Sequence, residues 1–202
     1  MKLILLSTPE FFVEEDKIIN ALFDEGLDLL HLRKLNSEPI YSERLLTLLP
    51  DSCHSRIIVH EHFYLKDEFN LRGIHLSAEH PEPPKGYSGH ISRSVHSLDE
   101  LKKEREGMDY VFLSPVFDSI SYPERHAGYT AQQLYDATRA GLIDRKVMAA
   151  GGISGKTLPL LADYGFGGAV ISGDLWHRFN IHSGLDYKEV IGHFRKLRKA
   201  AG

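Results

Sequence analysis

Two glycine-containing segments of the chain could bind an anion through their backbone amides. Gly151 and Gly152 follow one short apolar run, and Ser172 and Gly173 follow the next such run. Glycine lacks a Cβ atom, so a ligand can approach its backbone closely, and a helix that begins at Ser154 would present free amide groups to the ligand. We therefore predict that the two segments together bind one phosphate group.

Cationic and imidazole side chains follow other apolar runs. Arg33 and Lys34 come directly after the run that contains His31, and His60 and His75 end or interrupt two further runs. A guanidinium or ammonium group stabilises an anionic ligand, and a histidine can donate or accept a proton near neutral pH. These residues are candidates for a pocket that binds and transforms a charged substrate.

A second interpretation starts from the pair His60 and His62. Side chains two residues apart lie on the same side of a strand, and with Glu61, His80 or His96 they could form the transition-metal site of a hydrolase. The chain contains 12 histidines, so such a pair arises easily by chance. The metallohydrolase is an alternative to the anion-binding enzyme.

Eight short apolar runs, which alternate with amphipathic segments, must position these residues. Short aliphatic runs predict buried strands, and apolar residues spaced three and four apart predict helices. We expect strands at 3–6, 27–32, 56–59, 73–76, 90–95, 109–113, 147–150 and 168–172. We expect helices at 13–23, 37–49, 97–105, 130–140, 154–164 and 187–199, and a short extra helix after Ser172.

This alternation indicates an α/β protein with a parallel sheet. Eight strand–helix units in 202 residues are typical of a minimal closed barrel, so we predict a single (β/α)8 TIM-barrel domain over residues 1–202. Because periodicity alone does not show closure, a doubly wound sheet with an extra lobe is the alternative. In a barrel the loops after the strands meet at one mouth, which would bring the candidate residues together.

The composition excludes several classes of protein. Hydrophobic residues make up 42% and charged residues 26% of the chain, as in ordinary globular proteins. No run approaches the roughly 20 apolar residues of a membrane span, and the first apolar run is too short for a signal peptide. The net charge of -4 disfavours nucleic acid, and the lone Cys53 favours a reducing compartment. We expect a cytoplasmic protein that binds neither nucleic acid nor a membrane.

Six short motifs occur in a fixed order along the predicted strands. They are His-Leu-Arg at 31–33, Gly-Ile-His-Leu at 73–76, Ile-Ser-Arg-Ser-Val-His-Ser at 91–97, Asp-Tyr-Val-Phe-Leu-Ser-Pro-Val-Phe at 109–117, Ala-Gly-Gly-Ile at 150–153 and Gly-Gly-Ala-Val-Ile-Ser at 167–172. Their order resembles the thiamine phosphate synthase and TenI family over nearly the whole chain. The resemblance implies a barrel enzyme that joins hydroxymethylpyrimidine diphosphate to a thiazole phosphate, releases pyrophosphate and uses Mg²⁺.

The resemblance implies that the phosphate half of the family's site is well kept. The family has two hydroxyl residues after its sixth strand, and they correspond to Ser119 and Ser121. With Gly151, Gly152 and Ser172 they would bind the thiazole phosphate.

The residues that the family uses for the diphosphate match this sequence less closely than those for the thiazole phosphate. Arg33 matches a family arginine, whereas a family lysine is replaced by Tyr122. Diphosphate is a highly charged leaving group, so cations must stabilise it as the carbon–oxygen bond breaks. Lys34, Arg125 or Arg93 would have to supply the missing charge.

The metal ligands implied by the resemblance are altered as well. Glu61 keeps an acidic ligand after the third strand, and the family's second metal carboxylate falls at His80, beside Glu79. Mg²⁺ prefers carboxylate oxygens to imidazole. We expect an altered Mg²⁺ site at Glu61, Glu79 and His80.

These differences leave two alternatives to the synthase open. A TenI-type thiazole tautomerase needs a proton donor and acceptor rather than a diphosphate site. The histidine of that branch corresponds to Ser114, and His126 in the same loop is a substitute. A thiazole or thiamine phosphate binder without turnover is the third class. We favour the synthase, with Arg33, Lys34 and His126 as catalytic candidates and phosphorylated pyrimidine and thiazole substrates, and we leave a homodimer open.

Overall fold

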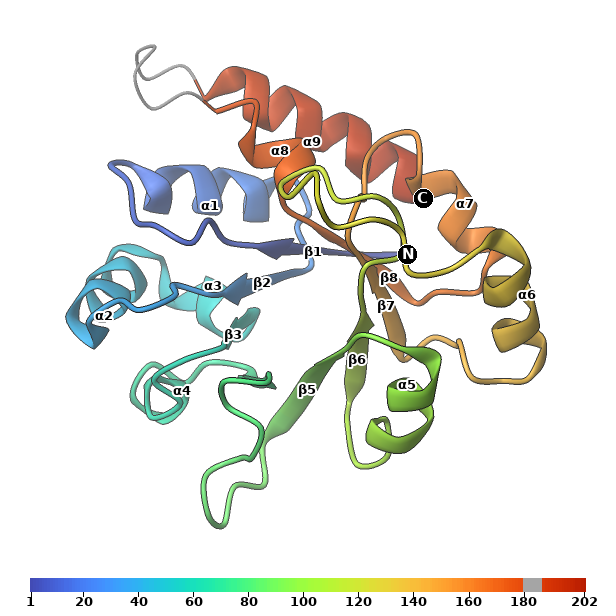
Figure 1. Ribbon diagram of the computed structural model, residues 1–202. Helices are drawn as coiled ribbons and strands as arrows, with labels where there is room; N and C mark the ends of the chain where they lie inside the picture. Colours follow the sequence, from blue (N-terminus) through green and yellow to red (C-terminus); the bar gives the residue numbers. More distant parts are fainter. Residues whose placement is uncertain (180–186) are drawn as a thin grey trace.

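The short apolar runs of the chain form eight parallel strands that close into a barrel (Figure 1). The computed structural model describes residues 1–179 and 187–202. Each strand pairs in parallel with the next one along the chain, and the last pairs with the first. The closure confirms the predicted (β/α)8 fold and overturns the doubly wound alternative. The strands are β1 (Lys2–Leu6), β2 (Leu29–Leu32), β3 (Ile57–Val59), β4 (Gly73–Leu76), β5 (His90–Val95), β6 (Tyr110–Leu113), β7 (Val147–Ala150) and β8 (Gly168–Ile171).

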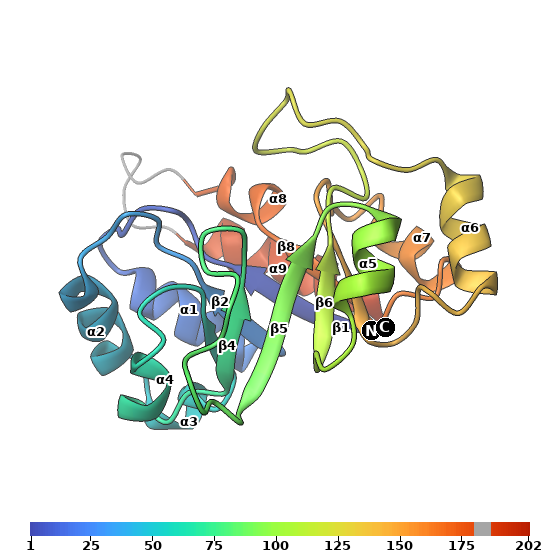
Figure 2. The same ribbon diagram turned by 60° about the horizontal axis from the view of Figure 1, so that its bottom comes forward.

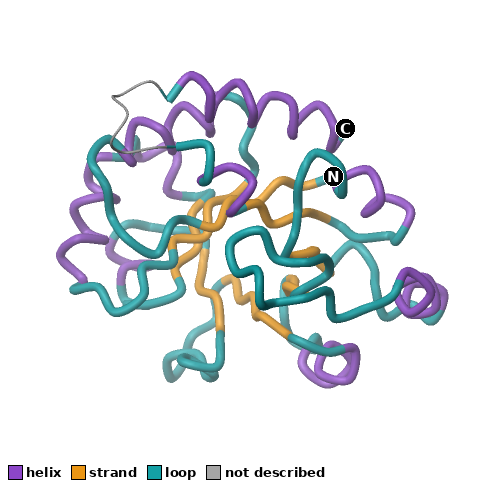
Figure 3. The backbone as a smooth tube through the Cα atoms, turned by 45° about the horizontal axis from the view of Figure 1, so that its top comes forward, coloured by secondary structure: helices purple, strands orange, loops and turns teal. Residues whose placement is uncertain are grey.

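Helices surround the strands on the outside of the barrel, as Figure 3 shows. They are α1 (Glu15–Asp24), α2 (Pro39–Leu48), α3 (Asp51–His54), α4 (Leu65–Glu68), α5 (Leu98–Glu104), α6 (Ala131–Arg139), α7 (Leu158–Asp163), α8 (Gly173–Trp176) and α9 (Lys188–Ala201). The short extra helix expected after Ser172 is α8. A loop without helix joins β4 to β5.

One predicted helix boundary is wrong and bears on the site. Helix α7 begins at Leu158 and not at Ser154. The Ser154 amide donates a hydrogen bond to Thr157 Oγ1 at 2.8 Å, which closes a turn before the helix. This amide is therefore not free for a ligand.

The main core lies between the strands and the helices. Alternate side chains of a strand point to opposite faces, so one set packs outward against the helices. Leu3 and Leu5 of β1 belong to this layer together with Ile18 of α1 and Phe194 of α9, and all four are fully buried. Burial of this layer holds the helices in place and leaves the second set of strand side chains inside the barrel.

The inside of the barrel is divided into an apolar and a polar part. Branched aliphatic residues commonly fill a barrel of this kind. Here Ile4, Met148 and Val170 form part of a separate apolar cluster, contributed by β1, β7 and β8. Leu29 of β2 also belongs to this cluster, whereas His31 of β2 and His75 of β4 are buried polar side chains. Polar groups without solvent must find partners within the barrel, which they do through the contacts described below.

Candidate active site at the barrel mouth

The loops that follow the strands enclose a pocket of about 580 Å³ at the mouth of the barrel. This volume suits one or two small-molecule substrates. The loop between β6 and α6, residues 114–130, rises above the mouth next to α8 (Figure 2). The site therefore lies where the barrel fold predicts it, with polar residues from the loops after β2 to β8.

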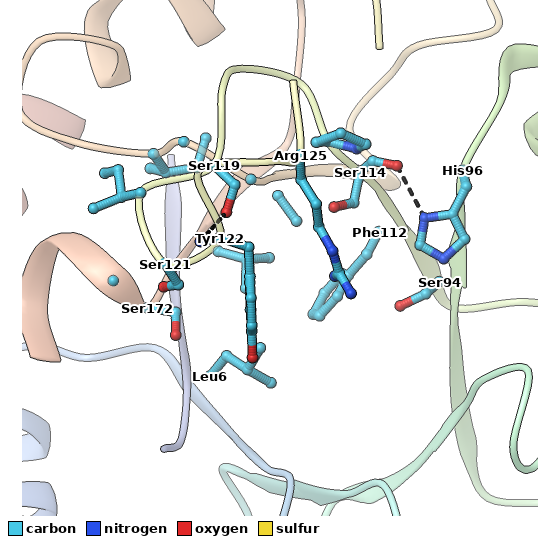
Figure 4. Close-up of a pocket in the computed structure, with 18 of the residues that line it drawn as sticks. Leu6, Ser94, His96, Phe112, Ser114, Ser119, Ser121, Tyr122, Arg125 and Ser172 are labelled. Atoms are coloured by element: carbon cyan, nitrogen blue, oxygen red, sulfur yellow. Dashed lines mark hydrogen bonds between the residues drawn. The ribbon is translucent and has the colours of Figure 1, made fainter. Parts of the chain in front are cut away.

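The predicted anion-binding segments meet on one side of this pocket. The pocket-lining residues among them are Ser119, Ser121, Gly151, Gly152, Ser172 and Gly173. Figure 4 shows Ser121 and Ser172 on the same side of the pocket. The structure thus brings together residues from the loops after β6, β7 and β8, which we call the hydroxyl–glycine cradle. That the cradle binds phosphate stays a prediction.

Close packing explains why glycine occupies these positions. A Cβ atom added to Gly152, whose φ is +67°, would lie 2.4 Å from the carbonyl oxygen of Asp118. A Cβ atom added to Gly173 would lie 2.4 Å from Ser121 Oγ. Loop 114–130 therefore rests directly on both glycines. Among the described residues, neither the Gly152 nor the Gly173 amide has a hydrogen-bond acceptor, which leaves both free for a ligand.

Two arginines supply positive charge to the pocket. The guanidinium of Arg125 lies 4.6 Å from the centre of the Tyr122 ring, and Figure 4 shows both side chains extending into the pocket. The Ser119 amide donates a hydrogen bond to the Arg125 carbonyl at 2.8 Å, which joins the two ends of the segment 119–125. Arg33 follows β2, and Ser7, which follows β1, fixes its backbone. The Ser7 hydroxyl accepts a hydrogen bond from the Arg33 amide at 2.9 Å and donates one to the Arg33 carbonyl at 3.0 Å. Both cations line the same cavity.

Lys34, predicted as a catalytic cation, lies outside the pocket. Its ammonium group lies 2.6 and 2.8 Å from the two carboxylate oxygens of Glu15, and it also donates to the Glu10 carbonyl at 2.8 Å. Both side chains of the pair are 1% exposed. Burial lowers the pKa of Lys34 and raises the pKa of Glu15, and the attraction between their charges opposes both shifts. Lys34 is a structural residue that ties β2 to α1.

Arg93 does not supply the missing charge either. Its guanidinium donates to the Glu104 carboxylate and to the Pro81 carbonyl, and the side chain does not line the pocket. Of the three candidates for the missing charge, Arg125 alone lies in the site.

The three predicted metal ligands do not converge. Glu79 lines the pocket, and the Ser77 hydroxyl, which donates to it at 2.7 Å, lowers the pKa of its carboxyl group. Glu61 lies outside the pocket and accepts the Lys34 amide at 3.1 Å, and burial raises its pKa. His80 is exposed and also lies outside the pocket. Among the described residues the ligand atoms of Glu61, Glu79 and His80 do not form one tight cluster, and Glu79 is the one of the three that lines the pocket. That these residues hold Mg²⁺ stays a prediction.

The histidines predicted for the site lie at three depths. The side chain of His126 is 79% exposed on the rim of the pocket, 3.6 Å from Asp118. His60 is 4% exposed and lines the pocket, whereas His31 and His75 are fully buried and do not line it. The rings of His60 and His75 stack at 4.2 Å. One group of side chains in the described part of the chain could hold a metal ion, because its three possible ligand atoms lie within 4.8 Å of one another. The group consists of His31, His60 and His75.

The ligand set predicted for the metallohydrolase does not assemble among the described residues. His62 Nε2 lies 3.0 Å from the Ser37 carbonyl oxygen, and His62 does not line the pocket. His96 lines the pocket, but its Nδ1 contacts the Ser114 carbonyl oxygen at 3.0 Å (Figure 4). Neither joins His60 in a cluster.

Sequence reasoning missed several polar residues of the pocket. Ser77 and Ser94 both line it. Ser94 lies two residues after the buried Ser92 on β5, and Ser77 two residues after the buried His75 of β4, so the alternation of strand side chains could have found both. The apolar residues Leu6 and Phe112 were also missed, and they line the pocket below the loops.

Comparisons with known proteins point to one family. A family model described as thiamine monophosphate synthase matches residues 5–174. The chain is 55% identical to a solved thiamine phosphate pyrophosphorylase from Bacteroides thetaiotaomicron, with a TM-score of 0.92 and coverage of 100% of this chain and 98% of that one. It is 18% identical to a thiamine phosphate pyrophosphorylase from Pyrococcus furiosus, with a TM-score of 0.76 and coverage of 99% and 95%, which shows the shared fold.

A curated relative is matched over part of its length. The chain is 28% identical over 158 residues to a thiamine-phosphate synthase from Synechococcus sp. (strain WH7803). The match covers 73% of this chain and 43% of the relative, so the chain spans less than half of that protein.

None of the described helices is both long enough and apolar enough to cross a bilayer.

Proposed function

This chain belongs to the thiamine monophosphate synthase family, and we propose that it is a thiamine phosphate synthase of thiamine biosynthesis. The reaction joins hydroxymethylpyrimidine diphosphate to a thiazole phosphate and releases pyrophosphate. The observation that carries the proposal is one pocket that contains both the hydroxyl–glycine cradle and two arginines. Two separate groups of anion-binding residues suit two phosphorylated substrates.

The hydroxyl–glycine cradle is the proposed site of the thiazole phosphate. The Ser121 and Ser172 hydroxyls and the free Gly152 and Gly173 amides can each donate a hydrogen bond to a phosphate oxygen. Hydrogen bonds to a charged acceptor are stronger than those between neutral groups. The cradle would hold the thiazole in place while the second substrate reacts.

Arg33 and Arg125 are the proposed partners of the diphosphate. Cleavage of the carbon–oxygen bond leaves a pyrimidine-methyl cation and places negative charge on the leaving group, so preorganised cations stabilise the transition state. Arg125 takes over the role of the family lysine that is replaced by Tyr122. The Tyr122 ring, 4.6 Å away, holds the guanidinium in place through a cation–π contact.

Mg²⁺ fits this site through one protein carboxylate. Magnesium is commonly bound by one or two carboxylates together with substrate phosphates and water. Glu79 is the pocket carboxylate that would hold the ion, and its lowered pKa keeps it ionised at neutral pH. The bound ion would neutralise charge on the diphosphate.

An assay of the purified protein with both substrates and Mg²⁺ tests this function. We expect pyrophosphate and thiamine phosphate to form in equal amounts. Absence of both products at high enzyme concentration would overturn the proposal. Conversion of a thiazole phosphate carboxylate to its tautomer would then identify a tautomerase, and tight binding of thiazole phosphate without either reaction would identify a binding protein.

Variants of the two arginines test the proposed division of roles. Loss of one preorganised donor to developing charge typically lowers kcat by about 10²–10³-fold, and we expect this of Arg33→Ala and Arg125→Ala. Affinity for thiazole phosphate should remain close to that of the parent protein. Arg139→Ala is the matched control, because Arg139 is 80% exposed on α6 and outside the pocket. Equal loss of turnover and of thiazole phosphate affinity would contradict the assignment.

A further inference from the structure

Three histidines from neighbouring strands meet inside the barrel, and the proposed reaction gives none of them a role. His31 lies on β2, His60 directly follows β3, and His75 lies on β4. One nitrogen atom from each of these side chains lies within 4.8 Å of the other two. We call this group the histidine triplet and ask whether its geometry, its hydrogen bonds and its access to the pocket suit a metal ion.

The separations of the three rings suit one shared ion. Zinc binds an imidazole nitrogen at about 2.0–2.1 Å, so three imidazoles around a tetrahedral ion place their ring centres roughly 5 Å apart. The His31 ring lies 5.1 Å from the His60 ring and 5.0 Å from the His75 ring. The His60 and His75 rings are stacked at 4.2 Å with their planes 20° apart. One of these two rings must turn out of the stack before both can direct a nitrogen at the same ion.

The hydrogen bonds of His31 leave its Nδ1 atom for an ion. A metal-bound imidazole usually donates its other N–H to an oxygen atom, which fixes the orientation of the ring. His31 Nε2 lies 2.6 Å from the Tyr110 hydroxyl oxygen, which can accept this N–H. His31 Nδ1 lies 2.9 Å from His60 Nε2. The nitrogen of His31 that can bind an ion therefore already faces a second member of the triplet.

The hydrogen bonds of His75 show which of its nitrogens carries the lone pair. The Ser92 hydroxyl donates to the Ile74 carbonyl at 3.4 Å, and a hydroxyl has one proton to donate. Ser92 Oγ therefore accepts a hydrogen bond from His75 Nδ1, which lies 2.8 Å away. The lone pair of the neutral ring is then on Nε2, where the Ser94 hydroxyl donates to it at 2.8 Å. An ion at His75 Nε2 would replace this one hydrogen bond.

His60 connects the triplet with the pocket. It is 4% exposed and lines the pocket, whereas His31 and His75 are fully buried. Among the described residues, His60 Nδ1 has no hydrogen-bond partner, so it can hold the ring proton when Nε2 binds an ion. An ion would enter from the pocket past His60, and a water molecule from the same side would complete its coordination.

The electrostatic surroundings favour a transition metal over a hard cation. Burial is the main cause that lowers the pKa values of all three histidines, to about 3 for His75, so each ring keeps a lone pair at neutral pH. The positive charge of Arg33 acts in the same direction on His60 and His75. Three neutral nitrogens beside a cation do not suit Mg²⁺ or Ca²⁺, which prefer oxygen ligands, whereas imidazole suits Zn²⁺.

We propose that His31, His60 and His75 form a Zn²⁺ site at the base of the pocket, separate from the Mg²⁺ ligand Glu79. The ligand atoms are His31 Nδ1, His60 Nε2 and His75 Nε2. The ion replaces the hydrogen bond between His31 and His60, and the His60 proton moves from Nε2 to Nδ1. This inference does not depend on the proposed function, because it is measured without substrates and uses none of the residues assigned to them.

Calorimetric titration of the chelator-treated protein with Zn²⁺ tests the site. In the presence of excess Mg²⁺ we expect one Zn²⁺ ion to bind per chain. Co²⁺ in place of Zn²⁺ should give the intense visible absorption of a tetrahedral site. Absence of binding, or the weak spectrum of a six-coordinate Co²⁺ ion, would overturn the proposal.

Variants distinguish the histidine triplet from histidines on the surface. Loss of a group that only orients a ligand typically lowers metal affinity 10–100-fold, so His75→Gln, which removes a ligand, should weaken Zn²⁺ binding by more than about 100-fold. His177→Gln, at an exposed histidine outside the triplet, is the matched control and should bind as the parent protein does. Equal affinity in His75→Gln and the parent protein would place the ion elsewhere and overturn the proposal.

A milder variant keeps all three ligands and the packing of the barrel. Tyr110→Phe removes only the oxygen partner of His31 Nε2, and we expect Zn²⁺ affinity to fall by about 10–100-fold. Tyr135→Phe, at the 40% exposed Tyr135 of α6, is the matched control and should leave the affinity unchanged. Equal affinities in the two variants would contradict the assignment of His31.

NMR of the parent protein tests the ligand atoms without any substitution. In long-range ¹H–¹⁵N correlations of the histidine-labelled protein, Zn²⁺ should shift Nδ1 of His31 and Nε2 of His60 and His75. His54, whose Nε2 donates to the Leu46 carbonyl at 3.0 Å, is an internal reference that should not change. Shifts confined to other histidines would overturn the proposal.

Discussion

The substitution Gly152→Ala tests whether loop 114–130 must rest on the glycines of the cradle. At a φ of +67° an added methyl group disfavours the backbone by about 1–2 kcal/mol. The methyl group would also lie 2.4 Å from the Asp118 carbonyl oxygen and 2.6 Å from Phe117 Cβ, and overpacking of this kind costs about 1–3 kcal/mol. We expect a loss of about 2–5 kcal/mol in the free energy of unfolding, which corresponds to a fall in Tm of roughly 4–20 °C for a chain of this size.

The same substitution should damage the cradle. To relieve the contact, the backbone at Asp118 must move, and it carries Ser119 and Ser121 with it. Thermal unfolding measures the first effect, and calorimetric titration with thiazole phosphate measures the second, where we expect affinity to fall by at least tenfold.

The chain offers a close control for Gly152→Ala. Gly155 has no positive φ, and a Cβ atom added there would meet Leu197 Cδ2 at an ordinary distance of 3.8 Å. Gly155→Ala should therefore leave both Tm and affinity nearly unchanged. Equal Tm values for the two variants, or full thiazole phosphate affinity in Gly152→Ala, would refute the packing argument.

Three further predictions follow from the charges. Lys34→Met should lower the free energy of unfolding, measured in urea, by about 3–5 kcal/mol because it leaves the buried Glu15 carboxylate without its ion-pair partner. The double variant Lys34→Met/Glu15→Leu should recover most of this loss. Glu79→Gln should raise the Mg²⁺ concentration for half-maximal activity by roughly tenfold or more, and an unchanged value would remove Glu79 as the ligand. The free energy of unfolding should fall as the pH is lowered from 6.5 towards 3, because unfolded histidines take up protons that buried native ones such as His75 do not, at about 1.4 kcal/mol per pH unit for each residue. In denaturant titrations from pH 7 to 5, His75→Gln should reduce this slope and the rim variant His126→Gln should not.

The position of the cradle could be predicted from the sequence, whereas the direction in which individual side chains point was harder to predict. Glycines and hydroxyls after β6, β7 and β8 converge because the carboxyl ends of parallel strands share one edge of a barrel, and backbone proximity alone suffices for them. The error at Lys34 arose from treating Arg33 and Lys34 as equivalent. Side chains alternate, so Arg33 follows the inward His31 and Lys34 points outward to α1.

Other errors come from local competition for hydrogen bonds. Glu61 follows the inward His60, so alternation turns it away from the pocket, where its carboxylate accepts the Lys34 amide. At Ser154 the sequence is compatible with a helix start, but the Thr157 hydroxyl captures the amide and delays the helix to Leu158. Composition and periodicity do not show which acceptor a backbone amide chooses, since that choice depends on tertiary contacts.

Loop 114–130 places both halves of the proposed site on one continuous segment, because Ser119 and Ser121 belong to the cradle and Arg125, which packs against the Tyr122 ring, lines the same pocket. A ligand that holds the loop still for one half also arranges the residues of the other half. Linkage then requires reciprocity: whatever factor the first substrate adds to the affinity of the second, the second adds to the first. The two substrates should therefore bind cooperatively even where they do not touch.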